Sequence, residues 1–476
     1  MTDKSRAGLS AWHLTMMAMG TVIGGSFFLG SAIAVKAAGP AILISFVLGG
    51  FLVYIILSAL SEMTVTNPAT GSFRTHAEQM YGPAVGFVLG WVYWTGLTLA
   101  MSSEATAASL FLRGWIPGVS LPVIAIIIVI AVTLFNLFGA KTLSNLESVL
   151  AFIKLFAIAL FIVIAIILIA GLWPGKPQVG LGALAKEPLI PAGLSGIAGS
   201  MLIVMFSYAG FEVIGLAAAE AKDPHRTVPR AIMMTILGLV GLYCLAITVL
   251  LPLVPTTRLS VTISPLVAGL TSVGFSWVAR TINVVLITAI LSTMLAAMFG
   301  LGRMIRSLAD VGYAPLWLKE EQEVPRRGIL FSGAGMLGGV ALSYMLQKSI
   351  YLFLVSAGGF ALLFTYAIIM ATHYKFRKVH GCPPKGNCQL WGFPYTTIIG
   401  LVSLIAIIVS MPLIPGQGSG LLAGISLVLL FILGYAIFKA KSVPWVKTWG
   451  IRLSGLMPST DVETAEEIEP KQEDKR

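Results

Sequence analysis

Three ionisable residues lie inside long apolar stretches of this 476-residue sequence, where a charge is energetically expensive. Lys154 is in ESVLAFIKLFA, Glu104 is in AMSSEATAA and Glu212 is in SYAGFEVIG. A lysine that alternates between a wet and a dry environment can gain and lose a proton. A carboxylate beside non-helical backbone can stabilise exposed amides or take part in gating. The residue types therefore point to proton movement and ion binding inside a membrane.

Two of the three residues also have an alternative interpretation. Lys154 could extend its ammonium group to the inner headgroups, with its methylene chain along apolar surface. Glu104 could be a carboxylate at the outer interface. Glu212 directly follows the interruption of the sixth span, and we expect a role in gating for it.

Two apolar stretches are interrupted by glycine near the middle of a span. The first reads MAMGTVIGGSFFLGSA and the sixth reads VMFSYAGFEVIGLAAAE. Non-helical backbone at mid-membrane depth is tolerated only where it lines a cavity, and interrupted spans at matching positions in two halves are typical of a transporter's binding site. The alternative is close helix packing, because glycine is common wherever membrane helices touch.

The two interruptions differ in polarity. The amides around Gly24 begin a half-helix and favour an anion, whereas the carbonyls around Ser207 end a half-helix and suit a cation. We therefore expect an amino acid between them, with its carboxylate at the first span and its ammonium at the sixth. The predicted residues of these two segments are Ile23, Gly24, Gly25, Ser26, Phe206, Ser207, Tyr208 and Ala209.

The composition of the whole chain is that of a membrane protein. Hydrophobic residues make up 57% and charged residues 11%, against about 25% charged in soluble domains, which excludes a soluble fold. Charge-poor windows of roughly 20 residues, bounded by Gly, Pro and charge clusters, predict an all-α integral membrane protein with twelve transmembrane helices. We place these helices at residues 13–38, 41–65, 83–110, 120–138, 147–172, 195–219, 231–254, 278–302, 329–346, 350–373, 395–414 and 419–438.

Basic residues orient the predicted helices. With both termini cytoplasmic, 23 Lys and Arg lie inside and 7 outside, and Lys154 lies within a span. The net charge of +11 then reflects topology and the anionic inner leaflet, so no nucleic acid partner is expected. We expect a multi-pass protein of the inner or plasma membrane in contact with lipid. Residues 1–12 are its cytoplasmic N-terminus, and residues 439–476 are a cytoplasmic tail, disordered at its end.

Six motifs in a fixed order resemble one transporter family. They are GTVIGGSFF, SEMTVTNPATGSFRTHAEQMYGP, GWVYW, ESVLAFIK, FSYAGFEVIGLAAAEAKDPHRTVPRA and GRMIRSLADVGYAP. Together they resemble the bacterial amino acid permease branch of the amino acid/polyamine/organocation (APC) superfamily. The resemblance implies a five-plus-five inverted repeat of the LeuT-like type and secondary transport of amino acids, usually coupled to protons. The repeats would be residues 13–172 and 195–373, with two further helices at 395–438.

The resemblance also implies a proton-coupling site. It puts Lys154 where sodium-coupled relatives hold a sodium ion, with Ser292 and Thr293 facing it. The ammonium group would then replace the cation.

Side-chain selection in such a site would come from Glu104, Tyr208 and Leu295. In relatives, Glu104 senses the amino group or side chain of the substrate. This sequence departs from its relatives by having Thr21 and Ser26 where glycine is usual and Leu295 where asparagine is common. The predicted pocket is thus less polar, which favours a neutral or apolar amino acid.

We predict uptake of amino acids by proton symport through alternating access. The alternatives are an amino acid or amine exchanger, in which Lys154 stays charged, and a non-transporting nutrient sensor on the same scaffold. No motif indicates an enzyme, a cofactor or a metal site. Cys382 and Cys388, in the inner loop HGCPPKGNC, are expected to be reduced. The sequence makes no prediction of oligomeric state.

Overall fold

The computed structural model describes residues 10–66, 72–138, 140–212, 214, 221, 223–260, 262–322, 324–345, 350–382 and 388–453. Side chains are described in these ranges except at residues 140–148, 343, 345, 350 and 441–453. The secondary structure of this part is helical, with no strand among the elements described. The chain divides into two compact units, with the boundary between Phe431 and Ile432. The site described below lies in the first unit. The predicted disorder at the end of the tail lies outside the described residues.

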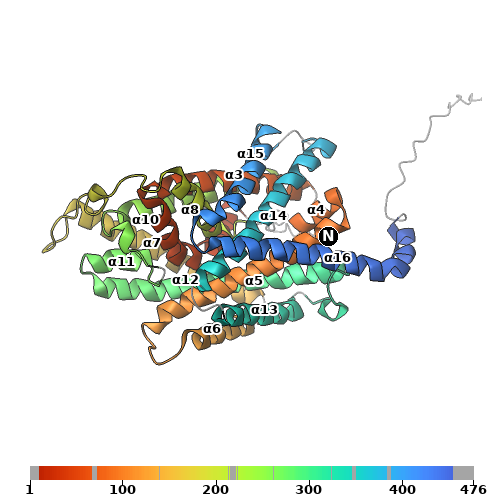
Figure 1. The fold of residues 1–476 in the computed structure, drawn as a ribbon, viewed down its shortest axis with the longest axis horizontal. Helices are drawn as coiled ribbons and strands as arrows, with labels where there is room; N and C mark the ends of the chain where they lie inside the picture. The colour runs from red at the N-terminus through yellow and green to blue at the C-terminus, as the bar shows by residue number, and fades with distance from the viewer. Residues whose placement is uncertain are drawn as a thin grey trace, which may run out of the picture. The chain divides into compact units, whose positions relative to one another are not determined.

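Every predicted span overlaps a helix (Figure 1). In the described part of the chain, eight helical segments are long and apolar enough to cross a membrane. This number fits a multi-pass membrane protein. The twelve-helix count and the inverted repeat stay predictions. The uninterrupted long helices are α3 (Ile42–Thr66), α5 (Pro83–Arg113), α6 (Leu121–Asn136), α7 (Ala140–Ala170), α10 (Pro224–Leu250), α12 (Ser276–Asp310), α13 (Arg326–Met345), α14 (Ile350–His380), α15 (Tyr395–Ser410) and α16 (Gln417–Leu453).

The first predicted span is divided into α1 (Ala11–Val22), a π-helical turn η1 (Ser26–Gly30) and α2 (Ser31–Ala38). The helix ends because Ile23 adopts an extended conformation with ψ 101°. Gly24 and Gly25 follow, where a Cβ atom would lie 2.9 Å from Thr293 Oγ1 and 2.5 Å from Glu104 Oε2, respectively. Glycine is required here by the close approach of neighbouring side chains.

The sixth predicted span ends its regular helix, α8 (Gly193–Tyr208), at the predicted interruption. Ala209 is extended with ψ 144°, and Gly210 has φ 105°, which L side chains rarely adopt. A Cβ atom on Gly210 would also lie 3.0 Å from the carbonyl oxygen of Thr21. The two interruptions therefore meet in space through a glycine.

Helix packing brings the three ionisable residues to these interruptions. α1 packs against α7, α10 and α12, and α5 packs against α12, α14 and the short helix α4 (Phe73–Tyr81). Lys154 on α7, Glu104 on α5 and Glu212 after α8 are all buried. By contrast, Ile127, Phe156 and Leu237 on the outer helices are exposed, as lipid-facing residues are.

One expectation about the inner loop is wrong. Cys382 and Cys388 form a disulfide, with Cα atoms 5.4 Å apart, within the range that a disulfide can join. Residues 383–387 between them lie outside the described part of the chain.

Candidate functional site

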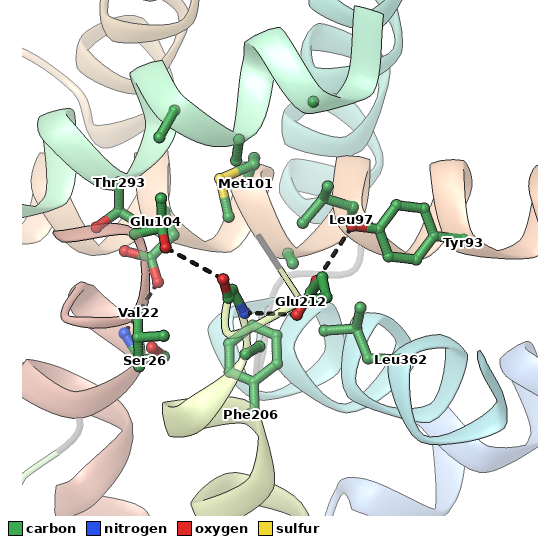
Figure 2. A pocket seen from close by; sticks show the side chains of 17 residues that line it. Val22, Ser26, Tyr93, Leu97, Met101, Glu104, Phe206, Glu212, Thr293 and Leu362 are labelled. Carbon is green, nitrogen blue, oxygen red and sulfur yellow. Dashed lines mark hydrogen bonds between the residues drawn. The ribbon is translucent and has the colours of Figure 1, made fainter. Parts of the chain in front are cut away.

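A cavity of about 70 Å³ lies between the two interrupted helices, α5, α12 and α14. Figure 2 shows Glu104 beside Ser26 and Thr293, and Glu212 beside Tyr93 and Leu362. Among the described residues, no lysine or arginine lines the cavity. Most of the wall is apolar and includes Val22, Leu97, Met101, Phe206, Ala297 and Leu362.

Glu104 binds the backbone of the first interruption. The amide of Gly25 donates to Oε2 at 2.6 Å, and the amide of Ser26 donates to Oε1 at 2.9 Å. Both carboxylate oxygens are therefore used on amides that begin the second half of the span, where a helix favours negative charge. The predicted anion site is occupied in this structure by a carboxylate of the protein itself.

Lys154 binds the other side of the same interruption. Its Nζ donates to the carbonyl oxygens of Gly20 and Ile23 and lies 3.4 Å from Thr293 Oγ1, while Thr293 Oγ1 donates to the Ile23 carbonyl at 3.0 Å. These carbonyls end α1, and cations are stabilised at a helix C-terminus. A positive and a negative side chain thus lie at opposite ends of one break.

Glu212 lies at the far side of the cavity and is held by neutral donors. The hydroxyl of Tyr93 donates to its Oε1 at 3.1 Å, and the hydroxyl of Tyr366 and the amide of Gly210 donate to its Oε2 at 3.2 and 3.0 Å. α5, α14 and the chain after α8 therefore meet at this carboxylate. Such a position suits the gating role that the sequence predicts.

Hydrogen bonds join the two interruptions directly. The Thr21 hydroxyl donates to the Gly210 carbonyl at 3.1 Å, and the Ser207 hydroxyl donates to the Ser26 carbonyl at 3.1 Å. The Ser207 carbonyl accepts from the Tyr243 hydroxyl at 3.2 Å. It is thus less available to a ligand ammonium than the sequence predicts.

The structure brings most of the predicted site residues together. Ser26, Glu104, Phe206, Ala209, Glu212 and Thr293 line the cavity, while Ile23, Gly24 and Gly25 supply backbone beside it.

Three predicted residues point elsewhere. Leu295 is buried but does not line the cavity, because one residue further along α12 turns the helix face by about 100° and brings Ala296 to it instead. Tyr208 donates its hydroxyl to the Phe46 carbonyl at 2.9 Å, away from the cavity. Ser292 Oγ has no hydrogen-bond partner within the described residues.

Tyr93, Leu97 and Met101 are cavity residues that the sequence analysis missed. With Glu104 they follow one face of α5 at intervals of four, four and three residues. Counting back along that helix face from Glu104 would have found them. Tyr243 and Tyr366 come from other helices, and no local spacing indicates them.

Comparison with known proteins decides the family. A profile of the amino acid permease family matches residues 13–448. The chain belongs to the amino acid permease family. The γ-aminobutyric acid permease of Bacillus subtilis is 29% identical over 450 residues, which cover 93% of this chain and 96% of the relative. The aromatic amino acid transport protein AroP of Escherichia coli K12 is 32% identical over 453 residues, covering 94% and 98%.

The permease is therefore a multi-pass membrane protein of a family of amino acid transporters. This agrees with the predicted APC resemblance over nearly the whole chain. Members of the family are permeases rather than enzymes, consistent with the absence of a predicted enzymatic motif.

Proposed function

We propose that this permease takes up amino acids by proton symport through alternating access. The observation that carries the proposal is that two side chains of opposite charge bind the two sides of one helix break. Lys154 contacts carbonyls that end α1, and Glu104 contacts the amides that follow the break. Loss of either charge would weaken the attachment of one half of this span to its neighbours.

The amino acid lies in the cavity between the two interruptions. Its carboxylate binds the amides of Gly25 and Ser26, and its ammonium faces the chain at Phe206 and Ala209, which line the cavity. The opposite polarity of the two breaks, which the sequence predicts, supports this arrangement.

The substrate has a neutral or apolar side chain. An apolar wall stabilises about 0.8 kcal/mol per buried methylene group, whereas a buried side-chain charge needs its own partner. Both cavity carboxylates already accept hydrogen bonds, Glu104 from two amides and Glu212 from three donors. The names of the relatives, for γ-aminobutyric acid and for aromatic amino acids, are compatible with such a substrate.

Lys154 couples the transport step to protons. While charged, it holds the Gly20 and Ile23 carbonyls with the help of Thr293. Release of its proton would free these carbonyls and let the inner half of the span move. The part of Ser292 in this step stays a prediction.

Uptake into proteoliposomes tests the proposal. Labelled common amino acids are offered with and without an inward proton gradient, to the unmodified protein, to Lys154→Ala and to the exposed control Lys36→Ala. We expect gradient-driven uptake to be lost in Lys154→Ala alone, with substrate binding retained. Uptake that requires sodium would contradict proton coupling. Uptake driven solely by counter-substrate would indicate an exchanger, and binding without flux would indicate a sensor.

The protein resides in the plasma membrane with both termini cytoplasmic. The excess of Lys and Arg in the predicted inner loops supports this orientation. Terminal epitope tags should resist protease in right-side-out vesicles and become accessible once the vesicles are opened. Digestion of the tags before opening would indicate the opposite orientation.

A further inference from the structure

The two amides proposed to bind the substrate carboxylate are already occupied. Gly25 and Ser26 each donate one N–H, and both N–H groups are directed to Glu104. The fit is close, because a Cβ atom on Gly25 would lie 2.5 Å from Glu104 Oε2. A substrate carboxylate can therefore reach these donors only by replacing Glu104.

Two ionised carboxylates in the same water-poor site destabilise each other, so one of them takes up a proton or finds a cation. The groups that face Glu104 are Lys154 on α7, Tyr243 on α10 and Tyr351 on α14, with the hydroxyl of Thr293 on α12 near Lys154. The Lys154 Nζ donates to the Gly20 and Ile23 carbonyls and contacts Thr293 Oγ1. Its ammonium group is thus bound at the end of α1.

We propose, resting on the amino acid transport function above, that the substrate carboxylate displaces Glu104 from the amides of Gly25 and Ser26 and that Glu104 then takes up one proton. The two hydrogen bonds to Glu104 break and two equivalent bonds to the substrate form. The proton comes from water on the open side of the cavity and converts the Glu104 carboxylate to a carboxylic acid. The zwitterion brings no net charge and the proton brings one positive charge, so the net charge of the site rises by one in this binding step.

The amide pair of Gly25 and Ser26 holds one negative charge throughout. Before binding it carries the carboxylate of Glu104, and after binding it carries the carboxylate of the substrate. The substrate ammonium, near α8, is balanced by the substrate's own carboxylate, and the added proton neutralises Glu104. Lys154 stays charged through binding, and its own proton change belongs to the later opening step.

The test measures binding and proton uptake together, with the purified full-length protein in nanodiscs. The probes are L-alanine, L-leucine and L-phenylalanine, each paired with the amine that lacks the carboxylate: ethylamine, 3-methylbutylamine and 2-phenylethylamine. We expect about one proton to be taken up per amino acid bound, and Kd to rise about tenfold per pH unit where Glu104 is ionised before binding. The amines, which cannot replace Glu104 on the amides, should neither bind comparably nor cause proton uptake.

Glu104→Gln should bind the amino acid with no proton uptake and with a Kd that does not change with pH. Glu104→Ala is the second variant, in case the glutamine variant fails to fold. Glu212→Gln is the matched control, because Glu212 lines the same cavity but accepts from Tyr93, Tyr366 and Gly210. It should keep the pH dependence of binding.

Proton uptake that persists in both Glu104 variants would overturn the inference, as would amines that bind as tightly as the amino acids. Either result leaves transport itself intact. Lack of binding and of uptake for every amino acid would instead refute the proposed function. Lys154→Ala separates the two steps, because it should lose gradient-driven uptake yet keep proton uptake on binding.

Discussion

Glu62 and Glu104 are both buried carboxylates on long helices, yet their surroundings differ. Glu62, on α3, accepts from the guanidinium group of Arg377, from His373 at 3.3 Å and from two backbone amides of the loop after α14. Glu104 accepts from two backbone amides of a broken helix and lines a cavity. Full burial is common to both, so burial alone does not identify a functional carboxylate.

The difference lies in what could replace each carboxylate. Arg377 also donates to the Leu390 carbonyl and contacts both disulfide sulfurs, so Glu62 belongs to a closed cluster that joins α3, α14 and the following loop. No solute reaches such a cluster without dismantling it. The amides bound to Glu104 adjoin a cavity, and another carboxylate of the right size can bind them. We infer that Glu62 stabilises the fold and that Glu104 is exchangeable.

The largest expected effect distinguishes the two carboxylates by stability. Glu62→Gln leaves the Arg377 guanidinium group buried without its anion, which costs about 3–5 kcal/mol. Glu104→Gln leaves Lys154 bound to the Gly20 and Ile23 carbonyls and should cost about 1 kcal/mol. The two variants are compared by thermal unfolding of the detergent-solubilised protein, monitored by size-exclusion chromatography. Equal losses of stability would remove the distinction.

The next effect concerns the contact between Glu104 and its amides. Gly25→Ala puts a Cβ atom into the space of the carboxylate and misplaces both the anion and the donors, so uptake should fall about 100-fold. Gly241→Ala, on α10, is the control, because no atom lies within 4 Å of the added Cβ. An uptake rate in Gly25→Ala equal to that of the control would show that this geometry is unimportant.

A smaller effect is expected at Tyr243, which stacks on Phe27 with ring centroids 4.0 Å apart and donates to the Ser207 carbonyl. Tyr243→Phe keeps the stacking and removes one neutral hydrogen bond, worth about 1 kcal/mol, so KM for uptake should change about fivefold. Tyr208→Phe is the matched variant, since its hydroxyl contacts Phe46 away from the cavity. It should lower thermal stability without changing KM; the reverse pattern would contradict the assignment.

The smallest effect is a pH dependence outside the membrane-spanning helices. Burial lowers the pKa of His76, on α4, from 6.5 to about 4. Between these values the unfolded chain binds more protons than the folded one, so stability falls as the pH is lowered, by at most about 1.4 kcal/mol per pH unit. Between pH 6.5 and 4, the melting temperature of His76→Asn should depend less on pH than that of the exposed control His380→Asn. Identical slopes in the two variants would exclude His76 as the cause.

The sequence predicts the helix interruptions well because their cause is local. Gly24 and Gly210 are glycines near the middle of long apolar spans, and both stand where the structure has non-helical backbone. The exchange of hydrogen bonds at Glu104 was not predictable in this way. Its partner Gly25 is 79 residues distant in the chain, and the pairing depends on how α5 packs against α12 and the first span.

The assignment of cavity-lining residues failed for a different reason. Leu295 and Ala296 are adjacent in sequence, yet only Ala296 lines the cavity, because one residue turns the face of α12 by about 100°. Apolar residues occur all round this helix, so hydrophobicity offers no correction. Side-chain orientation therefore needed the tertiary structure, even where the position of the helix did not.

The hydrogen bonds from Thr21 to Gly210 and from Ser207 to Ser26 make the two interrupted helices a single mechanical unit. Whatever binds at one interruption shifts the backbone that the other presents, and by thermodynamic linkage the influence is equal in both directions. The anionic and cationic ends of a zwitterion are then recognised cooperatively rather than as independent contacts. Acetate and methylammonium added together would accordingly be poor substitutes for glycine, since neither fragment can order both helices by itself.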